Sequence, residues 1–396
     1  MRGLPTTVGM IKSAACWVGW AVLMVAGIGT GHSQETMTEY MLTSPMIVDG
    51  KSGVVIERTR FRHRLPPGQA AVQIRNCKNV LIKNCAFFGI GAGIQISDSE
   101  NVGVQNCAFV DLFESGSGGV VPQIGVEVHQ TTGVEVEGCL FEFVSSGLHA
   151  VSSREVVFKR NMVFNILGPY PRGQAVQFSQ VTGGGNLIAE NYVLNEAGIS
   201  APQDCINLFE SSGIPESPIR VENNLLLGDP KNGNQGQSTS GSGIMAGDGG
   251  GSFQLIRKNC MNSPGQAGIG VAGGDQIVVV DNLVRGEAVG VSNVGISVWS
   301  QYPRKAGKVL ISSNTIGWKN KNFRENNFWQ GKAKFGPTWE FSEARWVDNQ
   351  LTWPEEVEVP VQPPAFGWLF TEGIKYSLRL KRPGMTLEHL GDLPSD

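Results

Sequence analysis

An asparagine recurs along most of this chain, each time at the end of a short run of β-branched and aliphatic residues. Successive copies lie roughly 22 to 36 residues apart, a period that is typical of repeat architectures built from one structural unit. A chain of this kind buries its apolar residues by stacking coils rather than by closing one globular core. The recurring positions are Asn84, Asn106, Asn161, Asn191, Asn223, Asn259, Asn282, Asn314 and Asn349, with Gly138 where the asparagine is missing.

Each repeat contains the same three short strands. The first has the form Gly-Ile-x-Ile, as at residues 93–96 and 295–298, the second ends at the recurring asparagine, and a brief apolar strand follows. Alternating apolar and polar residues indicate that each strand buries one face. Stacked in parallel at about 4.8 Å, such units predict an all-β, triangular parallel β-helix of about nine to ten coils.

The recurring asparagine has a structural explanation. It stands where the chain turns sharply from the second strand to the third, and asparagine tolerates the left-handed conformation that such a turn requires. Its side-chain amide can also bond to the asparagines above and below. We therefore expect this column of hydrogen-bonded asparagines, the asparagine ladder, to stabilise the fold and to take no part in catalysis.

Together, the Gly-Ile-x-Ile strand, the asparagine ladder and the short strand after it resemble the right-handed parallel β-helix of the pectate-lyase superfamily, over residues 71–350. The resemblance is closest to the exported members of that superfamily, and it implies terminal caps and an action on polysaccharides. The superfamily holds lyases, hydrolases, epimerases, tailspikes and adhesins. The motifs of polygalacturonases and pectate lyases are absent from this sequence, so the resemblance does not select a reaction.

The N-terminus predicts export. Arg2 and Lys12 precede an apolar run over residues 14–28, and small residues follow, so residues 1–33 are expected to be a cleaved signal peptide. An uncleaved membrane anchor is the alternative, because the run approaches the length that spans a bilayer. Residues 34–70 are expected to form an N-terminal cap and first rung, and residues 351–396 a C-terminal cap and tail. The mature protein is predicted to be a secreted or periplasmic monomer with no membrane attachment.

The charge and the cysteines exclude some classes of protein. A formal net charge of -3 lacks the basic stripe that nucleic-acid binding requires. Four cysteines directly follow the recurring position, and they predict a buried column of small side chains. Disulfides remain an alternative because an exported compartment permits them. These four residues are Cys85, Cys107, Cys139 and Cys260.

Loop lengths indicate which face carries the function. Long inserts such as residues 110–124, 167–174 and 228–242 lie on one side of the first strand, and other loops lengthen on its other side. Function on repeat scaffolds usually resides where loops grow, and in the resembling enzymes this face binds the substrate. The outward residues of the first strand are Gln73, Gln95, Glu127, His149, Gln177 and Asn207, followed by Met245, Gly270 and Ser297.

Four residues are candidates for catalysis. Glu127, His129 and His149 should cluster because adjacent coils lie about 4.8 Å apart, and a carboxylate beside imidazoles can act as general base and acid. Arg172, on a proline-rich loop one coil away, could neutralise a substrate carboxylate. The alternative for all four is a solvated polar surface.

Further residues are predicted to bind substrate. Two of them, Asp204 and Asp248, flank the first strand in neighbouring coils, and Trp299 could stack on a sugar ring. The sequence predicts no metal site; the cofactor is left unknown, with calcium kept open. The substrate-binding candidates are Gln95, Gln177, Asp204, Asn207, Asp248 and Trp299.

The favoured function is an exported polysaccharide-active protein, a lyase or epimerase acting on uronate-containing glycans. Both reactions begin by removing the proton next to a uronate carboxyl group, and Glu127, the histidines and Arg172 supply the required groups. A hydrolase needs two paired carboxylates, and the sequence offers only Glu127 and the more distant Asp204 for this pair, so a hydrolase is less favoured. The alternative class is a non-catalytic glycan-binding or surface-structural module.

Overall fold

The structure is a computed structural model that describes residues 38–116, 119–168, 173–196, 198–228, 241–288, 290–301, 306–331 and 341–352. The chain divides into Met1–Met37 and Thr38–Asp396, and all described residues belong to the second unit. The predicted signal peptide, most of the predicted C-terminal cap and Arg172 lie outside the described residues. None of the described segments is a helix long and apolar enough to cross a membrane.

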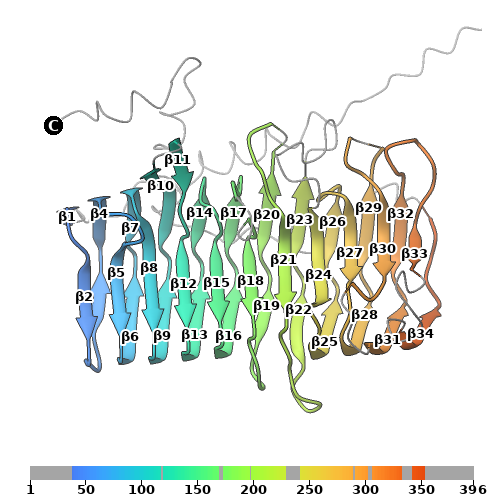
Figure 1. Ribbon diagram of the computed structural model, residues 1–396, viewed down its shortest axis with the longest axis horizontal. Coiled ribbons are helices and arrows are strands. Elements are labelled where there is room, and N and C mark those ends of the chain that lie inside the picture. The colour runs from blue at the N-terminus through green and yellow to red at the C-terminus, as the bar shows by residue number, and fades with distance from the viewer. Residues whose placement is uncertain are drawn as a thin grey trace, which may run out of the picture. The chain divides into compact units, whose positions relative to one another are not determined.

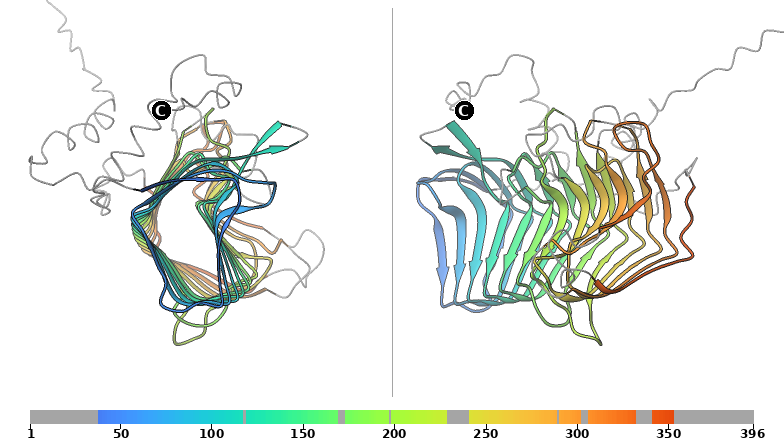
Figure 2. Two further views of the ribbon diagram at one scale, coloured as in Figure 1. Left: turned by 90° about the vertical axis from the view of Figure 1, so that its left-hand side faces the viewer. Right: turned by 45° about the vertical axis from the view of Figure 1, so that its right-hand side comes forward.

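The second unit is a right-handed parallel β-helix, as the sequence predicts (Figures 1 and 2). Three sheets surround a common core, and neighbouring strands of each sheet come from successive coils. The strands within each stack are parallel, and the one antiparallel pair of named strands in the described residues is β10 with β11. Because every coil repeats the same path, residues at the same place in each coil form rows along the helix.

Three named sheets contain all the strands of the described residues. Sheet A comprises β1 (Thr38–Leu42), β4 (Thr59–Arg64), β7 (Ala86–Ile90), β10 (Ala108–Gly116), β14 (Leu140–Glu142), β17 (Met162–Phe164), β20 (Tyr192–Asn195), β23 (Leu225–Gly228), β26 (Cys260–Asn262), β29 (Leu283–Gly286) and β32 (Thr315–Trp318), with β11 (Gly119–Pro122) beside β10. Sheet B comprises β2 (Met46–Asp49), β5 (Ala70–Arg75), β8 (Ala92–Ser97), β12 (Val126–His129), β15 (Leu148–Val151), β18 (Val176–Ser179), β21 (Asp204–Phe209), β24 (Ser242–Asp248), β27 (Ala267–Val271), β30 (Val294–Val298) and β33 (Phe328–Gln330). Sheet C comprises β3 (Val55–Glu57), β6 (Lys78–Lys83), β9 (Glu100–Gln105), β13 (Thr132–Glu137), β16 (Arg154–Lys159), β19 (Leu187–Ala189), β22 (Ile219–Glu222), β25 (Ser252–Arg257), β28 (Asp275–Val280), β31 (Ala306–Ser312) and β34 (Phe341–Val347).

The first coil lies within residues 34–70, where the sequence predicts an N-terminal cap and first rung. Strands β1, β2 and β3 already pair with the next strand of sheets A, B and C, so the region before residue 71 forms regular coil. Sheets B and C each contain 11 strands, which exceeds the expected nine to ten coils. Strand β2 of this first coil reads Met-Ile-Val-Asp and lacks the Gly-Ile-x-Ile form of the later coils.

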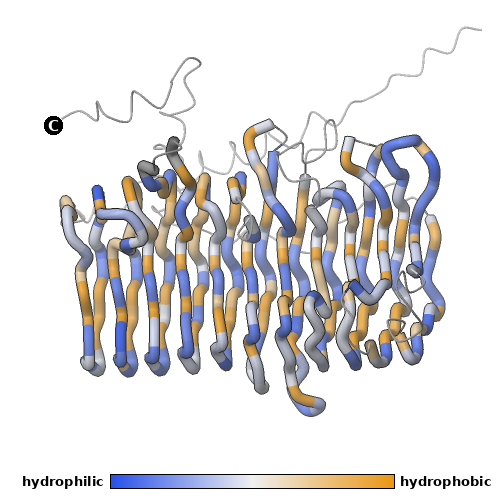
Figure 3. Tube along the Cα trace, viewed as in Figure 1, coloured by the Kyte–Doolittle hydropathy of each residue, from blue (hydrophilic) through white to orange (hydrophobic). Residues whose placement is uncertain are grey.

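The core is filled by rows of apolar side chains. Hydropathy alternates along the strands (Figure 3), and in β13 the buried Val134 and Val136 alternate with outward glutamates. In sheet A, Phe61, Phe87, Phe109 and Phe141 stack with ring centroids 4.8–4.9 Å apart. Each of these rings is fully buried, which stabilises the fold by about 1.5–3 kcal/mol per side chain relative to exposure.

The phenylalanine stack explains the glycine that opens the Gly-Ile-x-Ile strand. A Cβ atom added at Gly93 would lie 2.6 Å from Cδ1 of Phe109, and one at Gly125 would lie 2.6 Å from Cδ1 of Phe141. These distances are too short for non-bonded carbon atoms, so the first strand needs a residue without a side chain where it faces the stack. Its glycine is therefore a packing requirement and not a functional signal.

The sequence assigns two roles to one asparagine in the turn between sheets C and A, the left-handed conformation and the hydrogen bonds to neighbouring coils. In the structure, two adjacent residues take these two roles. The first position is left-handed in every described coil from Asn84 onward, with φ of 53° at Asn84, 56° at Glu190 and 55° at Asn223. The second position carries the ladder. The prediction that Asn84, Asn106, Gly138 and Asn223 belong to the ladder is therefore wrong, because all four occupy the left-handed position. The ladder residue of the Asn223 turn is its neighbour, Asn224.

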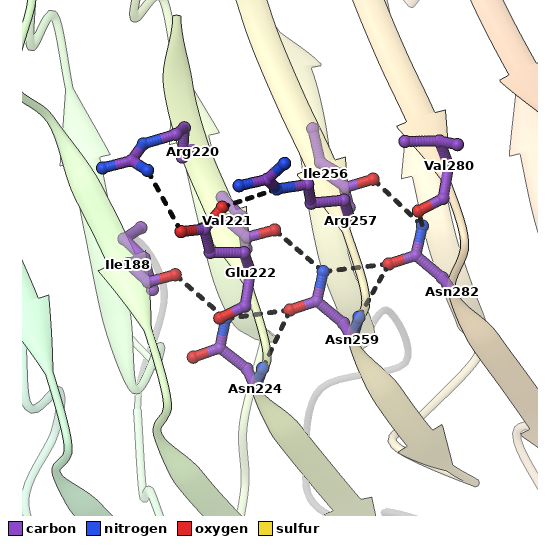
Figure 4. Close-up of polar contacts among 10 residues, drawn as sticks. All are labelled: Ile188, Arg220, Val221, Glu222, Asn224, Ile256, Arg257, Asn259, Val280 and Asn282. Atoms are coloured by element: carbon purple, nitrogen blue, oxygen red, sulfur yellow. Dashed lines mark hydrogen bonds and ion pairs between the residues drawn. The ribbon is translucent and has the colours of Figure 1, made fainter. Parts of the chain in front are cut away.

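The ladder itself is a chain of buried amides (Figure 4). Asn224 donates from its backbone N and from Nδ2 to Oδ1 of Asn259, at 3.1 and 2.9 Å, and Asn259 donates in the same way to Asn282. Nδ2 of Asn224 also donates to the carbonyl oxygen of Ile188 in the preceding coil. The ladder runs through Asn161, Asn191, Asn224, Asn259, Asn282, Asn314 and Asn349.

Cysteines occupy the same column in the earlier coils. The backbone N of Cys107 donates to Sγ of Cys139 at 3.4 Å, and the backbone N of Cys139 donates to Oδ1 of Asn161 at 2.9 Å. Cys260 does not belong to this column, because it follows Asn259 and pairs with Leu225 in sheet A. The six described cysteines are all buried thiols without a disulfide.

A pair of substitutions can distinguish how much each of the two turn positions contributes to stability. Asn224→Ala removes a buried amide that bonds in both directions, so we expect it to lower the free energy of unfolding by about 3 kcal/mol. Asn223→Gly keeps the left-handed conformation and should change it by less than about 0.5 kcal/mol. Chemical denaturation of both variants measures this difference, and equal effects would contradict the assignment of the ladder to Asn224.

Candidate functional site

The outer face of sheet B carries the predicted polar row. The parallel register aligns one outward residue from each strand from β5 to β30, and we call this line the outward row. Buried residues on either side of each member, such as Val126 and Val128 around Glu127, fix its outward direction. The outward row contains Gln73, Gln95, Glu127, His149, Gln177, Asn207, Met245, Gly270 and Ser297.

Loops flank the outward row at both ends of the sheet B strands. The insert over residues 110–124 forms the β10–β11 hairpin, which projects from the coil just before β12 (Figure 2). At the other ends of the strands, the connection between β21 and β22 extends away from the coil and closes on an antiparallel bridge between Ile214 and Ser217. The outward row thus lies between two sets of loops.

Glu127, His129 and His149 come together near the hairpin. Oε1 of Glu127 lies 3.6 Å from Nε2 of His129, and Gln95 donates from Nε2 to Oε2 of Glu127 at 3.4 Å. His149 is the register partner of Glu127 on the next coil, and its Nε2 lies 3.1 Å from Oγ of Ser179. The side chain of Glu127 is 13% exposed and that of His129 is 37% exposed, so the carboxylate is the more desolvated group of the two.

Farther along the outward row, one amide joins two carboxylates. Nδ2 of Asn207 donates to Oδ2 of Asp204 at 3.1 Å and to Oδ2 of Asp248 at 3.0 Å. Asp204 stands at the start of β21, and a bulge between β21 and β24 brings Asp248 opposite Phe209. We call Asp204, Asn207 and Asp248 the carboxylate cluster. The two carboxylates fix the orientation of the Asn207 amide, because they would repel its oxygen if it stood where Nδ2 stands.

The two carboxylates of the cluster have different surroundings. Asp204 is 3% exposed, and burial raises its pKa from an ordinary 3.8 to about 6, although hydrogen bonds from Asn207 and from the backbone of Ser242 act in the opposite direction. Asp248 is only half-buried. Two carboxylates with different environments can serve as acid and base in one reaction.

Two acidic residues on a different face were missed by the sequence reasoning. Asp111 and Glu142 are buried on the outer side of sheet A, and burial followed by the charge of Glu142 raises the pKa of Asp111 to about 7. Asp111 lies in the bulge between β7 and β10. An acidic residue inside the otherwise apolar third strand of two consecutive coils is the sequence signal that could have identified them.

The remaining predicted residues are placed as follows. Gln95 and Gln177 lie on the outward row, and Trp299 follows β30, with its ring centroid 6.4 Å from that of Trp329. The role of Arg172 stays a prediction, because it lies outside the described residues. Within the described ranges, no three His, Cys, Asp or Glu side chains are grouped so as to hold a metal ion.

Comparisons with known proteins identify the fold. The family model described as "Right handed beta helix region" matches residues 40–191. A search of the curated proteins gave no match. Among solved structures, DFA-IIIase from Arthrobacter chlorophenolicus A6 in complex with GF2 is 12% identical, with a TM-score of 0.50 over 83% of this chain and 87% of that chain.

Two other solved structures carry quite different descriptions. A point mutant of the periplasmic alginate epimerase AlgG is 11% identical, with a TM-score of 0.43 over 80% of this chain and 77% of that chain. PfbA, a surface adhesin of Streptococcus pneumoniae, is 12% identical, with a TM-score of 0.43 over 82% of this chain and 72% of that chain. At these identities the likeness shows the fold alone.

The pKa of Asp204 predicts a pH dependence of stability. Because its pKa is raised in the folded state, the folded protein binds this proton more tightly than the unfolded chain, and stability is lost as pH rises from 3.8 to about 6. Relative to Asp204→Asn, the wild type should therefore lose about 2–3 kcal/mol of unfolding free energy between pH 3.5 and about 7.

Denaturant unfolding of the two proteins over this pH range measures the effect. Titration of Asp111 occurs in both proteins and cancels in the difference. A difference between them that stays constant with pH would show that Asp204 is not desolvated as its burial indicates.

Proposed function

We propose that this protein cleaves glycosidic bonds in a polysaccharide at the carboxylate cluster. The observation that carries the proposal is the single amide nitrogen of Asn207 that lies 3.1 Å from an oxygen of Asp204 and 3.0 Å from an oxygen of Asp248. These two oxygens are consequently at most about 6 Å apart, the two hydrogen bonds laid end to end. Retaining glycosidases hold their carboxyl groups about 5–5.5 Å apart, and inverting ones about 6.5–9.5 Å.

The different surroundings of the two carboxylates suit the two roles of a retaining mechanism. Asp204, with a pKa of about 6, would donate its proton to the glycosidic oxygen as the bond to the anomeric carbon breaks. Asp248, the less buried carboxylate, would attack the anomeric carbon and form a glycosyl ester. Water would then attack the same carbon, lose a proton to Asp204, and release Asp248 as a carboxylate and the sugar as a hemiacetal.

Asn207 would act as a positioning residue in this reaction. Its Nδ2 donates to both carboxylates, so it holds their oxygens at a fixed separation and stabilises the ionised form of each. Asn207 is 4% exposed and extends from the middle of β21, which gives it a rigid support.

The shape of the outward row favours a polymer as the substrate. From Gln73 to Asn207 the row offers hydrogen-bonding side chains on six consecutive strands of sheet B, which span about 24 Å at 4.8 Å per coil. Such a line can contact several sugar units in succession. The predicted signal peptide supports an exported protein that meets its substrate outside the cytoplasm.

A second candidate reaction uses the other patch. The 3.6 Å contact between Glu127 and His129 and the adjacent His149 favour proton abstraction next to a uronate carboxyl group, the first step of a lyase or an epimerase. This reaction needs a cation for the substrate carboxylate, for which Arg172 is the candidate. We rank it second because the carboxylate cluster draws both groups of its reaction from described residues, whereas Arg172 lies outside them. A non-catalytic glycan-binding module is the alternative to both reactions.

Substitution of the carboxylates tests the proposed function. Asp204→Asn and Asp248→Asn should each lower the rate of release of reducing ends from the substrate polysaccharide by about 10²–10⁴-fold, because each removes one of the two groups that act on the bond. Asp98→Asn is the matched control, since Asp98 is an exposed turn residue with a φ of 49° that asparagine readily adopts. Full activity in both cluster variants would remove the carboxylate cluster from the mechanism.

The same assays separate the two candidate reactions. A lyase yields an unsaturated sugar that absorbs in the ultraviolet, whereas a hydrolase yields reducing ends without this absorbance. If unsaturated product forms and His149→Ala abolishes it, the Glu127 and His149 patch is the catalytic site and the hydrolase assignment is wrong.

A further inference from the structure

We propose that residues 374–382 of this chain, which we call the C-terminal segment, dock on the outer face of sheet A. The docking surface, which we call the sheet A patch, is an apolar cluster that is separate from the core. It lies on a different face from the carboxylate cluster, so its role does not depend on the proposed function. The sheet A patch consists of Ala108, Val110, Leu140 and Met162, with Ala86 and Tyr192 at its two ends.

The side chains of the sheet A patch point away from the core, yet they are covered. Along β10, Ala108 and Val110 alternate with the core residue Phe109. Because the three sheets surround one core, the outer face of sheet A meets neither of the other sheets of the described residues. The four central members of the patch are nevertheless only 2–6% exposed. A continuous apolar patch on an outer face is typical of a surface that another segment or molecule covers.

The C-terminal segment has the pattern that such a surface needs. Its first eight residues read Ile-Lys-Tyr-Ser-Leu-Arg-Leu-Lys, an alternation that is typical of a strand with one apolar face. From Ile374 to Leu380 a strand extends about 20 Å at 3.3 Å per residue. The sheet A patch runs over five neighbouring strands, from β7 to β20, which span about 19 Å at 4.8 Å per coil. The apolar side of the segment therefore matches the patch in length.

The chain leaves the described residues at the end of sheet A. Gln350 pairs with Thr315 of β32, the last strand of that sheet. Strand β20 lies four strands from β32, which is about 19 Å at 4.8 Å per coil. Residues 353–373 span at most about 70 Å when extended. They are long enough to bring the C-terminal segment to the sheet A patch without disturbing the coils.

Opposite charges favour the same pairing. Asp111 and Glu142 lie beside the patch on the adjacent strands β10 and β14. Oδ2 of Asp111 is buried and receives no hydrogen bond within the described residues. The C-terminal segment carries no acidic residue, and its long basic side chains can bend toward such a surface. A second copy docking through its own patch would instead place carboxylates against carboxylates. The basic residues of the segment are Lys375, Arg379, Lys381 and Arg382.

Photo-crosslinking tests the proposal in the full-length protein. A benzoylphenylalanine in place of Tyr376 keeps an aromatic side chain and, on irradiation, bonds to C–H groups that it contacts. Peptide mapping should place the cross-link within the same chain, on strands β7 to β20 of sheet A. A cross-link to β33 or β34 would show that the segment caps the end of the helix, and one to a second chain would show that copies pair. Either result, or the absence of a cross-link, overturns the proposal.

Thiol labelling measures the cover in a second way. Ala108→Cys places a thiol in the sheet A patch, whereas the six described native thiols are buried. In this background, Leu378→Asn removes an apolar contact and should raise the labelling rate of the introduced thiol by at least about 10-fold. Ser377→Asn is the matched control, because it introduces the same residue on the polar side of the segment, and it should change the rate by less than about 2-fold.

Two labelling results would overturn the proposal. One is rapid labelling of Ala108→Cys alone, and the other is an equal labelling rate in Leu378→Asn and Ser377→Asn. Labelling of the native Cys139 in Leu378→Asn would show that the coil itself has opened. The photo-cross-link then decides the question, because it is made in a protein that keeps Leu378.

Discussion

Backbone hydrogen bonding between parallel strands of successive coils is the constraint on which the rest of this structure depends. It holds neighbouring coils about 4.8 Å apart and allows no change of register without turning buried side chains outward. Any residue repeated once per coil must therefore meet its own copies. The phenylalanine stack, the buried ladder and the outward row all arise in this way, and residues such as Asn207 and Asp248, 41 positions apart, become hydrogen-bonding partners.

The corner between sheets C and A shows how one turn satisfies two requirements. The chain needs a residue with positive φ, and the next residue must satisfy backbone groups that the turn leaves buried. Many residue types meet the first requirement, among them Arg160 and Lys258, because the side chain at this position can point away from the core. The second is met by asparagine or cysteine, which can accept from the backbone N of the preceding coil's ladder residue.

The sequence predicts most of the fold because almost every coil carries the same sequence pattern. The outward row could be read residue by residue, since alternation within a strand leaves little freedom. The ladder was misplaced by one residue in four coils because asparagine is favourable at both corner positions, and sequence spacing cannot separate adjacent roles.

The candidate site was only partly readable for a different reason. That Asp204, Asn207 and Asp248 belong near one another follows from coil spacing, but the shared hydrogen bonds depend on a bulge between β21 and β24 that alternation does not reveal. Desolvation of Asp204 is likewise a property of its surroundings and not of its position in the repeat. Strand pattern locates the face, whereas loop and bulge geometry decides its chemistry.

The asparagine ladder also gives the molecule a direction. From Asn161 to Asn314 each Nδ2 donates to Oδ1 of the next asparagine toward the C-terminus, so these amide–amide bonds all run in one direction and each polarises the next. Each Nδ2 also donates to a backbone carbonyl of the preceding coil. The cysteine column before Asn161 has weaker donors and acceptors. Local opening under native conditions should therefore begin in the coils before Asn161. On this expectation Glu127 and His129 lie among the coils that open first, whereas the carboxylate cluster lies among coils that the asparagine ladder joins.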